Sequence, residues 1–354
     1  MSNPRLEINC DKIHHNARVL FHRLGKKGIS VTPVTKVCLG HPEVVQTLIN
    51  AGADMIADSR VENIECMRYS GITLPMMLIR SPMLSQTSRV VQSCDISLNT
   101  ELAVIKQLSK AANRLGRVHG VVIMIEQGDL REGVMQGNLE DFIRQMIHLP
   151  NIVLKGIGTN LTCRYGVAPD SDKMSNLSDL ADKIDRTFGI TLDIVSGGNS
   201  ANLNWALSND KKTRINHLRL GEAIFLGCET LYQQTIDGLF TDAITLTAEV
   251  IESKKKPSLP WGDLCLNAFG EQQKVLDRGN VSQAILAIGR QDVSIFGLKP
   301  PIGVNIVAST SDHLIVETSD FSLKVGQEVR FQLNYSALLS SMSSPFIHKC
   351  LVDN

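Results

Sequence analysis

The chain has 354 residues, which is enough for two domains and a large buried core. Its 36 lysine and arginine residues balance 36 aspartate and glutamate residues, so no net charge favours a nucleic acid or an anionic membrane as partner. The sequence has no apolar run of membrane-spanning length, no signal-peptide core and no C-x-x-C pair among its eight cysteines. We therefore expect a cytoplasmic protein with reduced cysteines.

The first two thirds of the chain alternate short apolar runs with amphipathic stretches. A strand at residues 5–9 and a helix from Asp11 to about Leu24 come first. Eight strands are then predicted, at residues 29–36, 55–57, 75–79, 94–98, 118–125, 153–159, 192–195 and 215–218. Helical stretches between them include residues 42–50, 61–69, 100–115 and 139–148. Eight strand-then-helix units imply parallel strands and predict an α/β fold, a closed (β/α)8 TIM barrel.

The pattern changes near residues 235–238. Strands without long helices between them are predicted at residues 243–252, 283–288, 303–308, 313–318 and 328–333. We therefore expect a barrel over residues 10–237 and a second, mostly β C-terminal domain over residues 238–354. The N-terminal strand, within residues 1–9, is expected to join the second domain.

Two glycine-containing turns follow the seventh and eighth predicted barrel strands, at residues 196–202 and 217–223. Glycine lets backbone N–H groups approach an anion, and a helix N-terminus adds partial positive charge. Asn199 and Ser200 are good N-cap residues whose side chains can also bind phosphate oxygens. These turns fit the phosphate site that a barrel builds after its last two strands, although the first of them also reads as an ordinary loop.

Three cationic residues stand at the ends of predicted strands. Lys36 ends the first strand, where it either snorkels to the barrel rim or acts as a desolvated Schiff-base lysine. Arg219 ends the eighth strand, and Arg131 follows the fifth. Together with a phosphate cradle, they call for a phosphorylated carbonyl cofactor that handles a carboxylate substrate. Pyridoxal 5'-phosphate (PLP) is the candidate.

With these motifs in order, the chain resembles the alanine racemase-like (fold type III) PLP enzymes, closest to their alanine/ornithine racemase branch. The resemblance covers nearly the full length. It rests on residues 34–37, 128–133, 156–160, 198–200 and 218–221 in the barrel, and on residues 311–314 and 334–335 in the second domain. A single motif of this kind is weak evidence, whereas several in order at strand ends are strong.

The resemblance implies a role for each matching residue. Lys36 would hold PLP as an aldimine. Ser200 and the backbone of Gly221 and Glu222 would bind the phosphate, with the Tyr335 hydroxyl adding a further hydrogen bond. Asn199, the N-cap of the first turn, belongs to the same cofactor-binding set.

Two arginines complete the implied site. Arg219 would face the pyridine nitrogen of PLP. Because arginine can only donate hydrogen bonds, that nitrogen would stay unprotonated, which weakens the ring as an electron sink and favours proton removal and return. Arg131 would bind near the cofactor phenolate or the substrate carboxylate. Alternatives remain open, because Tyr335 could be a core tyrosine and Arg131 a loop ion pair.

Departures from the alanine-specific pattern bear on the substrate. Met124 replaces a carboxylated lysine, Asn160 replaces a histidine that stacks under the cofactor, and Gly40 replaces a tyrosine. Residues 260–265 lack the catalytic tyrosine that the partner subunit supplies in that family. Racemisation needs a proton donor on the face opposite Lys36. The candidates for it are Asp312, Cys265, Asp263 and Cys38.

The same losses fit a roomier pocket, in which Glu132 or Asp312 could pair with the distal ammonium of ornithine or lysine. We therefore predict a PLP-dependent racemase that interconverts L- and D-amino acids. The catalytic set would be Lys36, Arg131 and Asp312. The resemblance further implies a homodimer with active sites at the interface.

Three alternatives remain. A decarboxylase of the same fold would carry a Cys-Gly-Pro-type motif, which is missing around Cys265. A metal-assisted lyase would use a His-x-Cys pair, which His348 and Cys350 match in spacing although no metal is expected here. A non-catalytic PLP-binding protein would share the barrel and lack residues 236–354.

Overall fold

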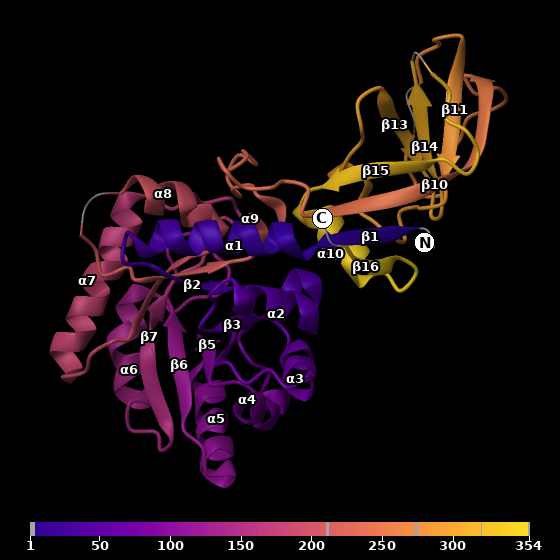
Figure 1. Cartoon of the computed structure of the whole chain (residues 1–354). Helices are drawn as coiled ribbons and strands as arrows, with labels where there is room; N and C mark the ends of the chain where they lie inside the picture. The colour runs from indigo at the N-terminus through magenta and orange to yellow at the C-terminus, as the bar shows by residue number, and fades with distance from the viewer. Residues whose placement is uncertain (1–3, 210–211, 273–274, 320, 353–354) are drawn as a thin grey trace. The chain divides into compact units, whose positions relative to one another are not determined.

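A computed structural model describes residues 4–209, 212–272, 275–319 and 321–352. The chain forms two compact units, one from Asp11–Thr241 and one from Met1–Cys10 together with Asp242–Asn354. Figure 1 shows the elements of both units along the chain. Residues 1–3 of the predicted N-terminal segment lie outside the described residues.

The first unit is built on an eight-stranded parallel sheet. Its strands are β2 (Ser30–Pro33), β3 (Ile56–Asp58), β4 (Met76–Leu78), β5 (Ile96–Asn99), β6 (His119–Met124), β7 (Ile152–Gly158), β8 (Ile194–Gly198) and β9 (His217–Leu220). They run in the order β2-β9-β8-β7-β6-β5-β4-β3. A parallel bridge between Val34 and Ala57 joins β2 to β3 and closes the ring. The predicted TIM barrel is confirmed.

Helices surround the barrel strands (Figure 1). They are α1 (Cys10–Gly25), α2 (Pro42–Asn50), α3 (Val61–Tyr69), α4 (Thr87–Ser93), α5 (Leu102–Leu115), α6 (Leu139–Met146), α7 (Ser171–Phe188), α8 (Leu203–Ser208) and α9 (Glu222–Leu226). Both α2 and α3 have the predicted bounds. Helix α7 starts where the Asp170 side chain accepts a hydrogen bond from the Lys173 N–H at 2.8 Å, and it ends at Gly189 in the left-handed conformation.

The first barrel strand is shorter than predicted. It ends at Pro33, and Lys36 begins the 3-10 turn η1 (Lys36–Cys38). The chain turns there because Leu39 and Gly40 both take positive φ values, 54° and 65°. The prediction that a strand runs to Lys36 was therefore wrong by three residues, although Lys36 stays at the carboxyl end of the strand.

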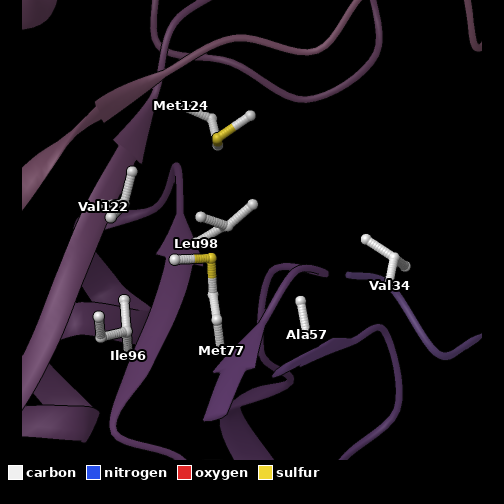
Figure 2. Close-up of a cluster of buried hydrophobic side chains, with 7 residues drawn as sticks. All are labelled: Val34, Ala57, Met77, Ile96, Leu98, Val122 and Met124. Atoms are coloured by element: carbon white, nitrogen blue, oxygen red, sulfur yellow. The ribbon is translucent and has the colours of Figure 1, made fainter. Parts of the chain in front are cut away.

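Apolar side chains from successive strands fill the barrel interior. Figure 2 shows this cluster, which contains Val34, Ala57, Met77, Ile96, Leu98, Val122 and Met124. Met124, at the last position of β6, is only 1 % exposed. Strands approach closely where they carry glycine, since a Cβ added to Gly156 would lie 1.8 Å from the Ile194 carbonyl oxygen. The core thus fixes the strand ends on which the polar residues stand.

The second unit is a mostly antiparallel sheet. Its elements are β1 (Arg5–Asn9), β10 (Ile244–Pro257), β11 (Asn280–Leu286), β12 (Leu298–Lys299), β13 (Val304–Ser309), β14 (Leu314–Thr318), β15 (Glu328–Leu333), α10 (Tyr335–Ser343) and β16 (His348–Val352). The sheet order is β12-β15-β10-β11-β14-β13. Strand β1 pairs antiparallel with β10 and parallel with β16. The sequence did not predict β12, α10 or β16.

In the part of the chain that the structure describes, every helix is too short or too polar to cross a lipid bilayer.

Candidate active site

Arg219 is the centre of the polar groups at the carboxyl ends of the barrel strands. Its side chain, 3 % exposed, donates to Ser196 Oγ, to the Thr159 carbonyl oxygen at 2.9 Å and to Asn160 Oδ1 at 3.4 Å. These partners are neutral, and no ion pair of Arg219 is found among the described residues. Burial and the positive charge of Arg131 lower the pKa of Arg219 to about 10, so it is still a cation at pH 7.

A buried histidine lies next to this arginine. His217 Nδ1 is 2.9 Å from Ser196 Oγ, and His217 Nε2 is 2.8 Å from Thr32 Oγ1. Burial, followed by the charge of Arg219, lowers the pKa of His217 to about 3. The ring is therefore neutral at physiological pH.

The two predicted phosphate turns meet. Asn199 caps the 3-10 helix η4 (Ser200–Asn202) by accepting from the Ala201 N–H at 2.8 Å. Ser200 Oγ accepts from the Ala223 N–H at 3.2 Å, and Ala223 lies in the first turn of α9, directly after Gly221 and Glu222. The turn after β8 and the turn after β9 are thus joined side by side, as the phosphate hypothesis requires.

Lys36 stands at the same end of the barrel. The Val34 N–H donates to the Leu220 carbonyl oxygen at 2.8 Å, and the Thr35 N–H donates to the Ala57 carbonyl oxygen at 2.8 Å. Lys36 therefore follows directly on the point where β2 leaves its two neighbours. Because all eight strands are parallel, Lys36 and Arg219 both belong to the carboxyl-end rim.

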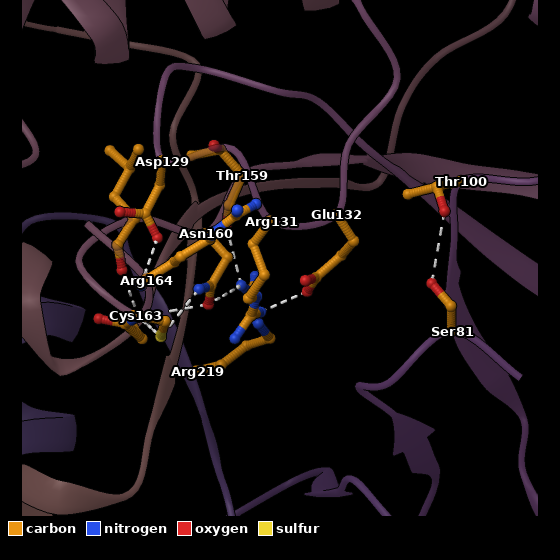
Figure 3. A network of polar contacts seen from close by, with 12 residues as sticks. Ser81, Thr100, Asp129, Arg131, Glu132, Thr159, Asn160, Cys163, Arg164 and Arg219 are labelled. Atoms are coloured by element: carbon orange, nitrogen blue, oxygen red, sulfur yellow. Dashed lines mark hydrogen bonds and ion pairs between the residues drawn. The ribbon is translucent and has the colours of Figure 1, made fainter. Parts of the chain in front are cut away.

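Arg131 lies in a loop that is ordered by two carboxylates. Asp129 accepts from the N–H groups of Arg164, Tyr165 and Val167, at 2.9, 3.0 and 3.3 Å. Glu126 Oε1 accepts from the Gly128 and Leu130 N–H groups at 2.6 and 3.0 Å. Figure 3 shows Arg131 paired with Glu132 and lying close to Arg219.

Asn160 and Asn199 converge on a cysteine that the sequence analysis did not select. Asn160 Nδ2 lies 3.1 Å from Cys163 Sγ (Figure 3). Asn199 Nδ2 lies 3.5 Å from the same sulfur. Asn199 Nδ2 also donates to Asn160 Oδ1 at 3.2 Å. The sequence signal that could have indicated Cys163 is its position, because it follows the strand-end Asn160 by three residues in the same loop.

Cys38 was a candidate for the proton donor opposite Lys36, and its surroundings argue against that role. It is buried, and its Sγ donates to the Thr35 carbonyl oxygen at 3.1 Å. Burial, followed by the charge of Asp58, raises the pKa of Cys38 to about 12. The group opposite Lys36 must give a proton in one direction of racemisation and take one in the other, and a thiol held in its protonated form cannot take one near neutral pH.

The remaining predicted residues have different surroundings. The Glu222 side chain accepts from Thr230 Oγ1 at 2.8 Å and from Gln233 Nε2 at 3.0 Å, so both oxygens of its carboxylate have a donor. Asp312 is exposed and accepts from Thr310 Oγ1 and Ser311 Oγ. Tyr335 begins α10. Asp312 and Tyr335 belong to the second unit, whereas Lys36, Arg131 and Arg219 belong to the first.

His348 and Cys350 lie on β16, where they pair with Arg5 and Glu7. Over residues 4–209, 212–272, 275–319 and 321–352, no group of three or more histidine, cysteine or acidic side chains is arranged to hold a metal ion.

Comparison with known proteins gives the family. The alanine racemase N-terminal domain model matches residues 8–228. The chain belongs to the alanine racemase-like, fold type III family of PLP-dependent enzymes, and it is an amino-acid racemase.

Two curated relatives match over almost their whole length. Ornithine racemase of Acetoanaerobium sticklandii is 39% identical over 353 residues, 99% of this chain and 99% of that protein. Lysine racemase of Thermotoga maritima is 38% identical over 352 residues, 99% of this chain and 98% of that protein.

Solved structures share the fold at lower identity. Alanine racemase from Streptomyces lavendulae superposes with a TM-score of 0.79 at 16% identity, over 100% of this chain and 98% of that one. Alanine racemase from Clostridium difficile superposes with a TM-score of 0.73 at 20% identity, over 100% and 97% of the two chains. The predicted two-part architecture is therefore that of alanine racemase.

Proposed function

We propose that this racemase acts on basic amino acids, with ornithine and lysine as its substrates. The observation that carries the proposal is its near-full-length similarity to an ornithine racemase and a lysine racemase, at 39% and 38% identity. The apolar Met124, in place of a carboxylated lysine, supports the same choice. Met124 is buried and uncharged, so the charge that the carboxylated lysine brings in the alanine-specific enzymes is missing at this position.

The side chains at the strand ends fit PLP. Arg219 is a buried cation whose described partners are all neutral, and Arg131 adds a second positive charge beside it. An isolated buried charge is costly, whereas the anionic groups of PLP and its acceptor nitrogen complement it. The joined turns at Ser200 and Ala223 offer a hydroxyl and helix N-termini to a phosphate. This donor set supports Asn160, Asn199, Ser200, Arg219, Gly221 and Glu222 (through its backbone) as cofactor-binding residues, with Tyr335 completing the set.

Bound PLP withdraws electrons from the α-carbon of the amino acid and so acidifies its α-proton. Lys36 would hold the cofactor and would remove or return that proton on one face. Arg219, which can only donate, would leave the ring nitrogen unprotonated. Arg131 binds the substrate carboxylate or the cofactor phenolate. Asp312, supplied by the second domain of a partner subunit, is the proposed acid on the other face.

Glu132 is the proposed partner of the distal ammonium of the substrate. Within the 126–133 loop, Glu126 and Asp129 are engaged by backbone N–H groups. The Glu132 carboxylate instead pairs with the Arg131 side chain and points toward the site (Figure 3). It is therefore the carboxylate of this loop that can exchange its partner for an ammonium group.

A homodimer with shared active sites and a cytoplasmic location complete the proposal. Eight free cysteines support a reducing compartment. Sedimentation of the dilute, PLP-loaded protein tests the dimer, because a fully active monomer would contradict a shared site.

Chiral chromatography of the PLP-loaded protein tests the substrate. L-ornithine, L-lysine, L-alanine and L-serine are incubated separately and followed for D-isomer, amine and keto acid. We expect D-ornithine and D-lysine to form faster than D-alanine or D-serine. Faster turnover of the neutral amino acids would remove the substrate proposal, and putrescine, cadaverine or pyruvate would replace racemisation by another reaction.

A further inference from the structure

Three buried polar side chains lead away from Arg219 through neighbouring strands of the barrel. Ser196 on β8 accepts from Arg219 Nη1, and its Oγ is 2.9 Å from His217 Nδ1 on β9. His217 Nε2 is in turn 2.8 Å from Thr32 Oγ1 on β2. Ser196, His217 and Thr32 are 1 %, 4 % and 2 % exposed. Water therefore does not compete for these hydrogen bonds.

The charge of Arg219 sets the direction in which the hydrogen bonds between Ser196, His217 and Thr32 are donated. Ser196 Oγ accepts from the guanidinium, so its lone pair faces the cation. If the Ser196 O–H donates to His217 Nδ1 and His217 Nε2–H donates to Thr32 Oγ1, every hydrogen points away from Arg219 and each bond polarises the next. The opposite tautomer would aim two N–H donors at one serine oxygen, with the dipoles opposed.

We propose that Thr32, His217 and Ser196 form a directed hydrogen-bond chain that fixes the orientation of the Arg219 guanidinium, which makes Ser196 and His217 positioning residues of the racemase. Ser196 Oγ holds Nη1 and the Thr159 carbonyl oxygen holds Nη2, so the guanidinium cannot rotate about its stem. The neutrality of His217 agrees with its lowered pKa. The catalytic part of this inference rests on the proposed role of Arg219 toward PLP. The existence of the hydrogen-bond chain does not depend on that role.

The barrel contains a matched control. Ser97 Oγ lies 2.8 Å from His119 Nε2, and both residues are buried. No arginine hydrogen bond to Ser97 is found among the described residues. Replacement of either serine by alanine removes a buried hydroxyl from a histidine, so a purely structural effect would be similar at the two positions.

The first test uses the protein without PLP. Nitrogen-15 labelling of histidine and long-range proton–nitrogen correlation NMR give the tautomer of His217. The His217 signals are assigned as those that disappear in a His217→Gln variant. We expect Nε2 to carry the proton and Nδ1 to be bare at pH 7. A proton on Nδ1, alone or in a doubly protonated ring, would overturn the directed chain whatever the enzyme's substrate is.

The second test compares Ser196→Ala with Ser97→Ala on the amino acid that the enzyme turns over fastest. Loss of a hydrogen bond to a charged group predicts that Ser196→Ala lowers kcat about ten-fold and leaves KM nearly unchanged. Ser97→Ala should leave kcat unchanged at a similar loss of Tm. Equal losses of kcat in the two variants, or none in Ser196→Ala, would overturn the positioning role.

Should Ser196→Ala not fold, Thr32→Val tests the far end of the chain. It removes the acceptor of His217 Nε2–H while nearly keeping the side-chain volume. We expect a smaller loss of kcat together with a change in the His217 nitrogen shifts. An unchanged kcat in a folded Thr32→Val variant would contradict the chain.

Discussion

At the scale of single residues, the charged side chains of the candidate site differ in whether hydrogen-bond or ion-pair partners already compensate their charge. The Asp129 carboxylate is occupied by three backbone N–H groups, which offset the effect of burial and lower the pKa of Asp129. Arg219 has neutral partners, and the Glu132 carboxylate has only the neighbouring Arg131 side chain among its described partners. A substrate with a carboxylate and a distal ammonium thus meets the Arg131–Glu132 ion pair, whose two members can exchange partners, and Arg219 stays available to the cofactor.

Glu132→Gln tests the specificity that follows. We expect KM for ornithine to rise about ten-fold, in the range of a lost charge pair, and KM for alanine to change little. Steady-state kinetics on both substrates checks this. Glu140→Gln, on α6 and paired with Arg144 at 2.9 Å, serves as the surface control. The same rise in KM for both amino acids would exclude recognition of the distal ammonium by Glu132.

Lys36→Ala tests the attachment of the cofactor. The wild-type protein should gain the mass of reduced PLP after treatment with borohydride, and the variant should not, because the Lys36 ε-amine is the group proposed to bond to the PLP carbonyl. Intact-protein mass spectrometry measures the difference. Lys155→Ala, which removes an exposed lysine that pairs with Asp193, should still gain the mass. Labelling that persists in Lys36→Ala would place the cofactor lysine elsewhere.

Residues at strand ends were the predictable part of the site. Lys36, Arg219 and Asn160 each follow an apolar run, and the barrel brings the ends of such runs to one rim. Cys163 was not predicted, because its contacts with Asn160 and Asn199 depend on a loop conformation that has no periodic signal. Likewise, nothing in the local sequence separates His217 from an ordinary core histidine until Ser196 and Thr32 are seen beside it.

At the scale of elements, the loops after β6 and β7 act as one structure. Asp129, in the first loop, accepts backbone N–H groups of the second loop, including that of Arg164 (Figure 3). The Arg164 side chain donates back to the Leu130 carbonyl oxygen. The first loop carries Arg131, and the second carries Asn160 and Cys163. Their relative positions therefore depend on one buried carboxylate.

Asp129→Asn tests this clamp. The amide can accept through one atom only, so at least one backbone N–H loses its partner, at a cost of about 1–3 kcal/mol. We expect faster hydrogen exchange at Arg164, Tyr165 and Val167 and a lower kcat, whereas Asp193→Asn on the surface should change neither. Unaltered exchange in residues 163–167 would show that other contacts hold the loops.

Helix α10 shows why some elements escaped prediction. It contains Ser336, Ser340, Ser341 and Ser343, and serine disfavours helix interiors because its hydroxyl competes for the backbone. In the structure the Ser340 and Ser341 hydroxyls donate to carbonyl oxygens four residues earlier, at 2.9 and 2.6 Å. Burial of Ala337, Leu338 and Met342 stabilises the helix. Tertiary packing therefore outweighs the low helix propensity of this segment, and that packing cannot be inferred from a single sequence.

At the scale of the whole molecule, two buried histidines couple stability to pH. Burial lowers the pKa of His119 to about 4, and burial together with Arg219 lowers that of His217 to about 3. Both values lie below the ordinary histidine pKa of about 6.5, so between pH 6.5 and 4 the unfolded chain binds protons that the folded chain refuses. The free energy of unfolding should therefore fall with decreasing pH in this window.

Urea denaturation at pH 7, 6 and 5 measures the effect. We expect a loss on the order of 1 kcal/mol per pH unit for each histidine once the pH is below 6. His119→Gln should reduce the slope without touching the Arg219 chain. Burial raises the pKa of Asp58, which acts in the opposite direction. Asp58 therefore makes the fall of the unfolding free energy toward acid pH less steep. A free energy that is level between pH 7 and 5 in the wild type would contradict the prediction.

Strand β1 has a consequence for synthesis on the ribosome. Its two neighbours in the sheet are β10 and β16, so residues 5–9 pair with strands that emerge more than two hundred residues later. The eight strands of the barrel sheet pair with one another, so all of them are available once β9 has left the exit tunnel. The nascent chain meanwhile carries β1 without its two neighbours, with Leu6 and Ile8 unburied, and such an unpaired edge can recruit other strands. The period between completion of β9 and release of β16 is thus when this strand edge is exposed to other chains.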